Sequence, residues 1–169
     1  MPSMDRLFLE NRLFRVFRLE KYSVLSIGCH PASQIYRRLL PEDSYHTLDI
    51  DPGNARYGAA SHTVGDCREL HTLFGGRRFD LILFNGIIGY GINDEGMLRA
   101  FLASAHSVLS DKGWLVIGYN DIPERKGELI HAIDPRLFRK TDFTDVIPSR
   151  VELKTHNRHT FEFYRRLAE

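Results

Sequence analysis

The sequence predicts an α/β fold: a doubly wound, mostly parallel seven-stranded sheet with helices on both faces and a C-terminal antiparallel hairpin. Short apolar runs that end at Gly or Asp alternate along the chain with helical patterns, which is typical of parallel strands joined by crossover helices. The strongest helical pattern directly follows the strongest strand pattern. Only the tail alternates apolar and polar residues, as an edge hairpin does.

The composition limits the architecture and the partners. The 169 residues are 43% hydrophobic, enough for one buried core, so residues 1–169 are predicted to form a single domain. The 23 Lys and Arg nearly balance the 22 Asp and Glu, which gives no strong nucleic-acid signal and no attraction to a membrane surface. No apolar stretch suits a secretory signal or a membrane span, and only two cysteines occur. We therefore expect a cytoplasmic protein.

The first half of the chain repeats a pattern of strand, turn and helix. Residues 1–21 contain an amphipathic helix, Met4 to Leu19, whose apolar side chains include Leu7, Phe14 and Phe17. Each strand that follows ends at Gly or Asp, which breaks the extended run. The predicted strands are Val24–Ile27, Tyr45–Asp49 and His62–Val64, and the predicted helices are Gln34–Leu40, with Ile35 on its apolar face, and a short one through Leu70 and Phe74.

The second half contains the clearest signals. The run Phe79–Phe84 is continuous enough to be a central strand and ends at a glycine-rich loop. The segment Asp94–Leu109 has apolar residues three and four apart and acids in its first turn, which predicts a helix. Trp114–Tyr119 is the fifth predicted strand. Residues 120–149 are predicted to be loop and short helix that could form a lid, and residues 150–169 to form the terminal hairpin.

Glycines and acids gather where the predicted strands end. In doubly wound sheets, ligands bind outside the carboxyl ends of the strands, near the point where the strand order reverses. Gly28 follows the first strand and permits a turn that lets the backbone approach a ligand. Asp49 ends the second strand about 20 residues later, the spacing at which a carboxylate meets the hydroxyls of a cofactor ribose. The pair predicts a nucleotide-type cofactor.

Asp66, after the third strand, has two interpretations. Its carboxylate could accept a hydrogen bond from an adenine amine while the backbone amide of Cys67 meets the ring. It could instead only cap the helix that follows, and without the other two positions capping would be the better explanation. A nicotinamide cofactor fits less well, because "GCHPAS" keeps only the first glycine of the GxGxxG pattern.

Several segments, taken in order, resemble the motifs of one enzyme family. They are "VLSIGCHPAS", "LDIDPGN", "VGDCREL" and "FDLILFNGIIGYG", followed by "LRAFLASAHSVLSDKGWLVIG". In this order and spacing the chain resembles the class I S-adenosylmethionine-dependent methyltransferases. The resemblance covers residues 22–119, the predicted cofactor-binding core, and "RHTFEFYRR" resembles the family's last antiparallel strand. The joint occurrence is a stronger signal than any one motif.

The resemblance implies S-adenosylmethionine as cofactor, with S-adenosylhomocysteine as its product. It implies that Gly28 shapes the loop under the methionine part, that Asp49 binds the ribose diol, and that Asp66 and Cys67 frame the adenine. Asn85 and Gly86 would lie close to the sulfonium. The full implied cofactor-binding set is Gly28, Cys29, His30, Asp49, Ile50, Asp66, Cys67, Asn85 and Gly86.

The first motif departs from the family pattern at three positions. Ser26 stands where the family usually has an acid, and His30 and Ala32 stand where it has further glycines. The His30 side chain could fill the space of the cofactor's amino-acid end, turn outward, or hydrogen-bond the carboxylate. We expect binding to be retained, because Pro31 holds the turn and the following amides still face the ligand. The alternative is a non-catalytic binding or scaffold protein with a methyltransferase-like frame.

The catalytic residue is not assigned from the sequence. Tyr90 and Asp121 are the candidates at the carboxyl edge of the sheet, with Tyr119 and His30 as further proton acceptors. Tyr90 is predicted to contact the substrate, because it follows the fourth strand in a glycine-rich loop.

The other chemistry-bearing residues are predicted to have structural roles. His156 and His159 flank the hairpin turn and are expected to be solvated, and no metal is assigned. Cys29 and Cys67 are expected to be small buried hydrophobes. The expected substrate is a small molecule methylated on oxygen or nitrogen, and the oligomeric state is left open.

Overall fold

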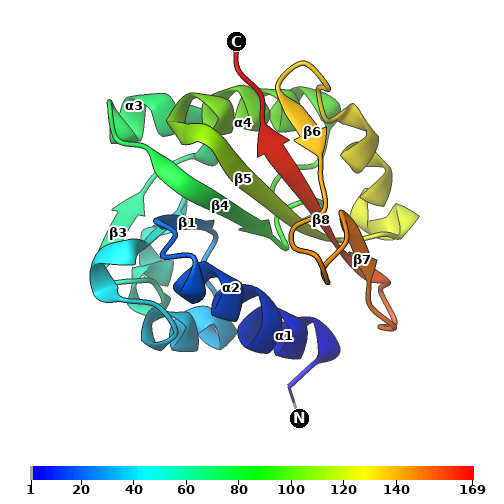
Figure 1. The fold of residues 1–169 in the computed structure, drawn as a ribbon, viewed down its shortest axis with the longest axis horizontal. Helices are drawn as coiled ribbons and strands as arrows, with labels where there is room; N and C mark the ends of the chain where they lie inside the picture. The colour runs from blue at the N-terminus through cyan, green and yellow to red at the C-terminus, as the bar shows by residue number, and fades with distance from the viewer. Residues whose placement is uncertain (1) are drawn as a thin grey trace.

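The computed structural model describes residues 2–169 and confirms the predicted α/β class. The sheet has eight strands in the order β3-β2-β1-β4-β5-β8-β6, with β7 paired to β8 (Figure 1). β1 to β5 are parallel to one another, and β8 runs antiparallel to β5, β6 and β7. The strands are β1 (Val24–Ile27), β2 (Tyr45–Asp49), β3 (Ser61–Val64), β4 (Phe79–Asn85), β5 (Leu109–Asn120), β6 (Phe138–Lys140), β7 (Arg150–Glu152) and β8 (His159–Arg166).

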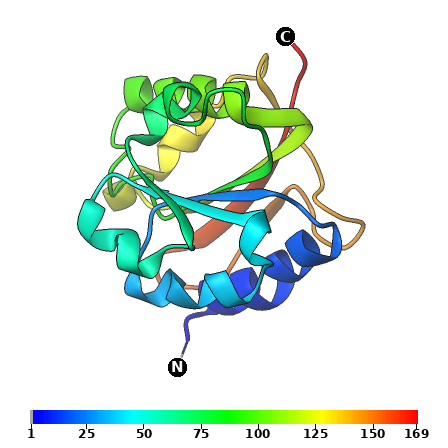
Figure 2. The same cartoon turned by 90° about the vertical axis from the view of Figure 1, so that its left-hand side faces the viewer.

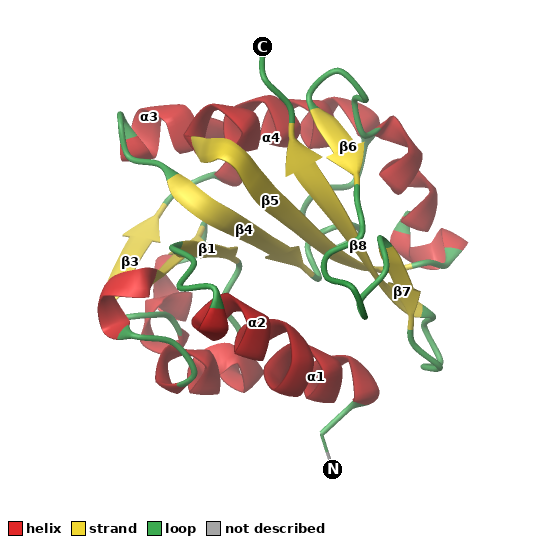
Figure 3. Ribbon diagram, in the orientation of Figure 1, coloured by secondary structure: helices red, strands yellow, loops and turns green. Residues whose placement is uncertain are grey.

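Helices cover both faces of the sheet, as predicted. α3 and α4 lie on one face, and α1 and α2 lie on the other (Figures 2 and 3). Within residues 2–169, no helix has the length and apolar character needed to cross a membrane. The helical segments are α1 (Met4–Phe8), η1 (Leu9–Leu13), α2 (Phe14–Leu19), η2 (Pro31–Arg38), η3 (Glu42–Ser44), η4 (Pro52–Tyr57), η5 (Cys67–Glu69), α3 (Leu70–Phe74), α4 (Glu95–Val108), η6 (Pro123–Arg125) and η7 (Gly127–Ala132).

Each face of the sheet buries its own aromatic layer. On one face, Phe101 of α4 stacks on Phe84 of β4, with ring centroids 4.0 Å apart. On the other face, Phe143 stacks on Phe163 of β8 at 4.7 Å and meets the edge of Phe17 of α2 at 6.1 Å. Fully burying a side chain of this size contributes on the order of 1.5–3 kcal/mol. The two layers fix β4 and its neighbours, and therefore the strand ends on which a ligand site depends.

The N-terminal helix spans the predicted range but contains a π-helical turn, η1, at its centre. Such a turn accommodates an extra residue and shifts the phase of the apolar face. Leu9, Leu13 and Phe17 are buried, whereas Leu7, which we expected in the packing face, is 42% exposed. The prediction for Leu7 is wrong because it assumed an uninterrupted 3.6-residue period.

The helix after β1 begins earlier than predicted and has a tighter geometry. It is a 3-10 helix, η2, with three residues per turn. That period brings Tyr36 into the core and leaves Ile35 42% exposed. The prediction that Ile35 lies on the buried face of this helix is therefore wrong.

The segment 120–149 is more ordered than a loop with short helices. It contributes β6, which pairs with β8, so the sheet has eight strands and not the predicted seven. Phe138, Phe143 and Ile147 in this segment are buried. Its role as a lid stays a prediction. The terminal hairpin is confirmed, with β7 paired antiparallel to β8.

Candidate active site

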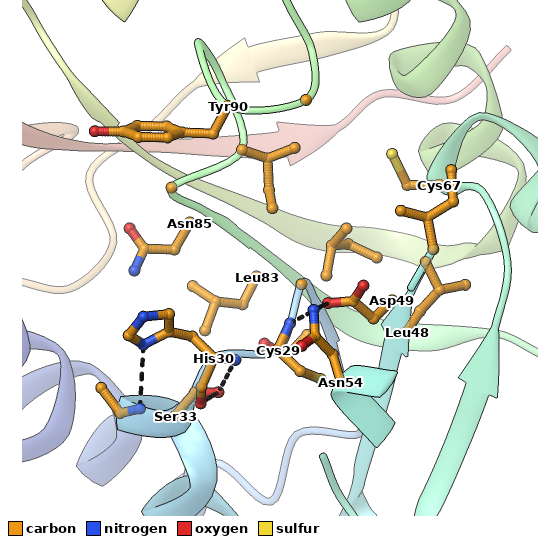
Figure 4. A pocket seen from close by; sticks show the side chains of 18 of the residues that line it. Cys29, His30, Ser33, Leu48, Asp49, Asn54, Cys67, Leu83, Asn85 and Tyr90 are labelled. Carbon is orange, nitrogen blue, oxygen red and sulfur yellow. Dashed lines mark hydrogen bonds between the residues drawn. The ribbon is translucent and has the colours of Figure 1, made fainter. Parts of the chain in front are cut away.

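A cavity of about 1030 Å³ lies at the carboxyl ends of β1, β2 and β4 (Figure 4). Small-molecule sites typically have volumes of roughly 300–1,000 Å³, so this cavity is at the upper end of that range. β1 lies between β2 and β4, where the strand order reverses, as the rule for doubly wound sheets requires. Every residue of the predicted cofactor-binding set lines this cavity, and so does Tyr90.

Gly28 shapes the turn that leaves β1. Its φ of +86° lies in the region that favours glycine, and its N–H donates to the Leu48 carbonyl at 2.7 Å. A Cβ at this position would lie 2.6 Å from Cδ1 of Ile87, in the loop after β4. A larger residue would therefore disturb two loops of the cavity.

Asp49 joins the loops that follow β1 and β2. Its side chain is buried and accepts hydrogen bonds from the backbone N–H groups of Cys29 at 2.7 Å and Asp51 at 2.8 Å. The Asn54 amide donates to it at a longer 3.3 Å. Since a carboxylate has about four lone-pair positions, one position is free and the long Asn54 bond can yield to a ligand. This carboxylate therefore fits a ribose hydroxyl pair.

Asp66 caps the short helix η5 and also lines the cavity. Its carboxylate accepts from the Arg68 backbone N–H at 2.9 Å and pairs with the Arg68 guanidinium at 2.6 Å. The guanidinium lowers the pKa of Asp66, because it hydrogen-bonds the charged carboxylate. The capping interpretation is confirmed, while contact of Asp66 with an adenine stays a prediction.

The two cysteines are free, buried and poorly suited to act as nucleophiles. Burial raises the pKa of Cys29 to about 11 and the pKa of Cys67 to about 12. Both thiols are therefore protonated at neutral pH. Across residues 2–169, no group of three or more His, Cys, Asp and Glu side chains is arranged to hold a metal ion.

Alkylation by iodoacetamide at pH 8 should be slow in the folded protein for Cys29 and Cys67. Thiolate is the reactive form, and raised pKa values of about 11 and 12 keep it scarce at this pH. Mass spectrometry should find at least a tenfold slower rate than in the urea-unfolded chain, where the thiols return to a pKa of about 8.5. Equal rates in the folded and unfolded chain would contradict the burial.

His30 serves as the N-terminal cap of η2. The ring Nδ1 accepts a hydrogen bond from the Ala32 N–H at 3.1 Å, and the backbone N–H of His30 donates to Ser33 Oγ at 3.0 Å. Because Nδ1 is the acceptor, the proton of the neutral ring is on Nε2. In Figure 4 the ring lies between Asn85 and the start of η2. The ring is therefore held at the edge of the cavity by its own helix.

His159 is buried, so the expectation that it is a solvated loop residue is wrong. It begins β8 and is 7% exposed, with its ring at the cavity. Its Nε2 lies 2.9 Å from Asn85 Oδ1 and its Nδ1 lies 2.8 Å from Asn120 Oδ1. Burial lowers the pKa of His159, and the charge of Asp5 opposes this shift. His156 is exposed in the turn, as expected, and also lines the cavity.

Tyr90 stands at the cavity with contacts on its hydroxyl and its ring. Nδ2 of Asn120 lies 3.0 Å from the hydroxyl oxygen, and the Arg125 guanidinium lies 4.3 Å from the ring centroid. The side chain is still 53% exposed. Because these contacts fix the ring while it stays accessible from the cavity, Tyr90 is suited to contact a substrate.

Asp121, the other catalytic candidate, does not line the cavity. Its carboxylate pairs with Arg150 at 3.1 Å and Arg158 at 3.6 Å. Tyr119 is fully buried on the sheet. Both were selected because they lie at the carboxyl edge of the sheet, but the sequence alone does not reveal the arginines that hold Asp121 or the face that buries Tyr119.

Several cavity residues were not selected from the sequence. They come from segments remote from the motifs and are Ser3, Asp5 and Arg6 from the N-terminal region, and Thr155 and Asn157 from the β7–β8 turn. For His159 a signal did exist. The alternation of the tail puts it on the same face as Phe161 and Phe163, which are buried.

Comparison with solved structures identifies the architecture. The N-methyltransferase NodS from Bradyrhizobium japonicum WM9 superposes with a TM-score of 0.68 at 18% identity, covering 99% of this chain and 100% of NodS. The NodS complex with S-adenosyl-L-homocysteine gives 0.66 at 17% identity, covering 92% and 85%. This chain has the class I methyltransferase fold.

Two further methyltransferases support the same fold. A TehB-like S-adenosylmethionine-dependent methyltransferase from Corynebacterium glutamicum gives a TM-score of 0.65 at 19% identity, covering 94% of this chain and 87% of that one. One from Methanosarcina mazei gives 0.62 at 15% identity, covering 94% and 98%. No family model and no curated protein matches the sequence. The methyltransferase fold is thus shared with proteins of very different sequence.

Proposed function

We propose that this chain is an S-adenosylmethionine-dependent methyltransferase that acts on oxygen or nitrogen of a small molecule. The observation that carries the proposal is the convergence of Gly28, Asp49 and Asn85 on one cavity of the methyltransferase fold. Each position alone would be weak support. Together they match what the motif resemblance implies for a cofactor loop, a ribose acid and a residue near the sulfonium.

In this proposal the residues of the chain bind and orient. When bound, S-adenosylmethionine would supply a methyl group on its sulfonium for in-line transfer to an oxygen or nitrogen of the acceptor, with S-adenosylhomocysteine as the leaving group and the acceptor's proton passing to a base or to water. Asp49 accepts from the ribose hydroxyls, and the turn at Gly28 lets the backbone approach the methionine part. Ile50 is 68% exposed beside Asp49 and offers apolar surface to the adenine. Most of the rate is expected to come from holding the nucleophile close to the methyl carbon.

The rival function is a scaffold with a degenerate cofactor loop, since His30 and Ala32 replace glycines. Calorimetric titration with S-adenosylhomocysteine, with NADH as the control ligand, separates the two. We expect micromolar binding of S-adenosylhomocysteine, which is about −8 kcal/mol, and none of NADH. If neither ligand binds, the scaffold function is favoured.

His30→Gly should bind S-adenosylhomocysteine as tightly as the wild type or more tightly. The ring narrows the cavity edge, and its main bond is to the Ala32 amide of its own helix. Glycine is itself an acceptable N-cap, so η2 should lose only a few tenths of a kcal/mol. Calorimetry measures the affinity, and an affinity at least tenfold weaker would make His30 a ligand contact instead.

The acceptor is proposed to be a small molecule. Outside the cofactor motifs, the cavity lining includes a short stretch of the N-terminal region, Asn120, the 155–157 turn and His159. An RNA acceptor is less well supported, because a chain with formal net charge +1 lacks the excess of basic residues that RNA binding favours. A cytoplasmic location stays a prediction.

A further inference from the structure

A chain of hydrogen bonds links the end of β4 and the loop that follows it to β5 and β8 at the same cavity. It runs from Asn85 at the end of β4 through His159 of β8 to Asn120 of β5, and from there to Tyr90. All of these side chains line the cavity, and His159 is the buried centre of the chain. The motif resemblance assigns no role to His159 or Asn120.

The single N–H of a neutral His159 ring determines how the two flanking amides are oriented. A neutral imidazole has one N–H, so one ring nitrogen donates and the other accepts. His159 is therefore able to donate to the oxygen of only one of the two flanking amides. The other amide must turn its NH₂ group toward the ring, which a half-turn of an Asn side chain achieves without moving its other atoms. Asn85 and Asn120 are thus oriented in opposite senses.

Two arrangements satisfy this rule. In the first, His159 donates from Nε2 to the Asn85 oxygen, Asn120 donates to Nδ1, and the Tyr90 hydroxyl donates to Asn120. Asn85 then offers its NH₂ to the cavity, and the Tyr90 oxygen offers a lone pair. In the second, His159 donates from Nδ1 to Asn120, Asn85 offers its oxygen, and the Tyr90 hydroxyl hydrogen is free.

The surroundings of His159 favour a neutral ring and leave little space around the Asn85 amide. Burial opposes the charged form of the ring. Asn85 is confined by Gly118 of β5, where a Cβ would overlap Asn85 Oδ1 and lie 2.8 Å from the Phe161 ring. The absence of a side chain at Gly118 therefore makes the Asn85–His159 contact possible. In Figure 4 the Asn85 amide stands between Tyr90 and His30, so its second polar atom faces the cavity.

We propose that His159 is a positioning residue that couples the Asn85 amide to the Tyr90 hydroxyl, so that the cavity presents one hydrogen-bond donor and one acceptor there. The inference rests on the proposed function, because it takes the methyl acceptor to bind beside Asn85. An uncharged amine, a hydroxyl or a primary amide both donates and accepts, and therefore matches. A protonated amine has no acceptor atom and a carboxylate has no donor, so neither matches.

The first test observes the ring directly. Long-range proton–nitrogen NMR of the ¹⁵N-labelled protein at pH 7.5 distinguishes a protonated from an unprotonated ring nitrogen. We expect one of each for His159 in a single tautomer, with distinct NH₂ signals for Asn85 and Asn120. Two protonated nitrogens, or a rapid average of both tautomers, would overturn the inference.

The second test uses paired variants. His159→Phe removes both ring nitrogens, whereas His159→Gln keeps one donor and one acceptor. His106→Phe is the matched control, because His106 is also buried, bonds the Leu167 carbonyl at 2.8 Å and is not in the cavity lining. We expect His159→Phe to weaken S-adenosylhomocysteine binding about fivefold and to shift the Asn85 and Asn120 NH₂ signals. His159→Gln and His106→Phe should stay within about twofold of the wild-type affinity.

The outcomes separate this inference from the proposed function. If the wild type binds S-adenosylhomocysteine and His159→Phe keeps both its affinity and its Asn signals, the positioning role is wrong. An equal loss of affinity in His106→Phe would also overturn it, because the loss would then report general destabilisation. If the wild type does not bind the ligand, the proposed function fails, while the ring nitrogens still decide the state of His159.

Discussion

Asp49→Ala is expected to weaken S-adenosylhomocysteine binding by more than tenfold while the protein remains folded. The change removes the proposed acceptor of the ribose hydroxyls and releases the Cys29 and Asp51 amides that the carboxylate holds. Hydrogen bonds to a charged group contribute about 1.5–3 kcal/mol each, and tenfold in affinity is only about 1.4 kcal/mol. Calorimetric titration of the wild type and the variant measures the difference.

Asp80→Ala is the matched control for this effect. Asp80 is also a sheet carboxylate that accepts from a backbone N–H, that of Ser23, at 2.9 Å. It does not line the cavity. Both variants should lose stability, because Asp49→Ala leaves two backbone N–H groups and Asp80→Ala one without a partner, at a cost of about 1–3 kcal/mol each. Only Asp49→Ala should lose affinity, and an unchanged affinity would remove Asp49 from the site.

The parts of the fold that follow from local patterns were predictable. β1 and β2 have the predicted bounds, because each is a short run that ends just before residues that disfavour extended structure, Gly28 after β1 and Pro52 and Gly53 after β2. α4 is capped by Asp94, whose carboxylate accepts from the Met97 N–H at 2.8 Å, as the acids at its start predicted. Since these signals lie within a few neighbouring residues, no tertiary contact is needed to find them.

The parts that depend on distant contacts were not predictable in the same way. Asn85 and His159 are 74 residues apart in the chain and meet because β8 inserts beside β5. Asp121 follows β5 as expected, yet arginines of the terminal hairpin hold its carboxylate away from the cavity. The π-helical turn in the first helix changes which apolar residues are buried, and no sequence pattern predicts this turn. Motif order therefore located the side of the cavity where we propose that the cofactor binds, whereas the opposite side required the folded chain.

Gly28→Ala is expected to reduce S-adenosylhomocysteine affinity at least tenfold. The backbone at this position has φ +86°, which costs a residue with a side chain roughly 1–2 kcal/mol. The new methyl group would also lie 2.6 Å from Ile87 Cδ1, so the Ile87 side chain must move, and Ile87 lines the same cavity. Thermal unfolding measures the strain, and calorimetry measures the loss of binding.

The double variant Gly28→Ala/Ile87→Ala separates the clash from the conformation. Shortening Ile87 removes the clashing Cδ1, so the double variant should be relieved of that part of the destabilisation. The positive φ persists, and the methyl group still stands where the backbone is proposed to approach the methionine part, so affinity should stay low. Recovery of wild-type affinity in the double variant would mean that Ile87, and not the backbone of the Gly28 turn, limits the cofactor space.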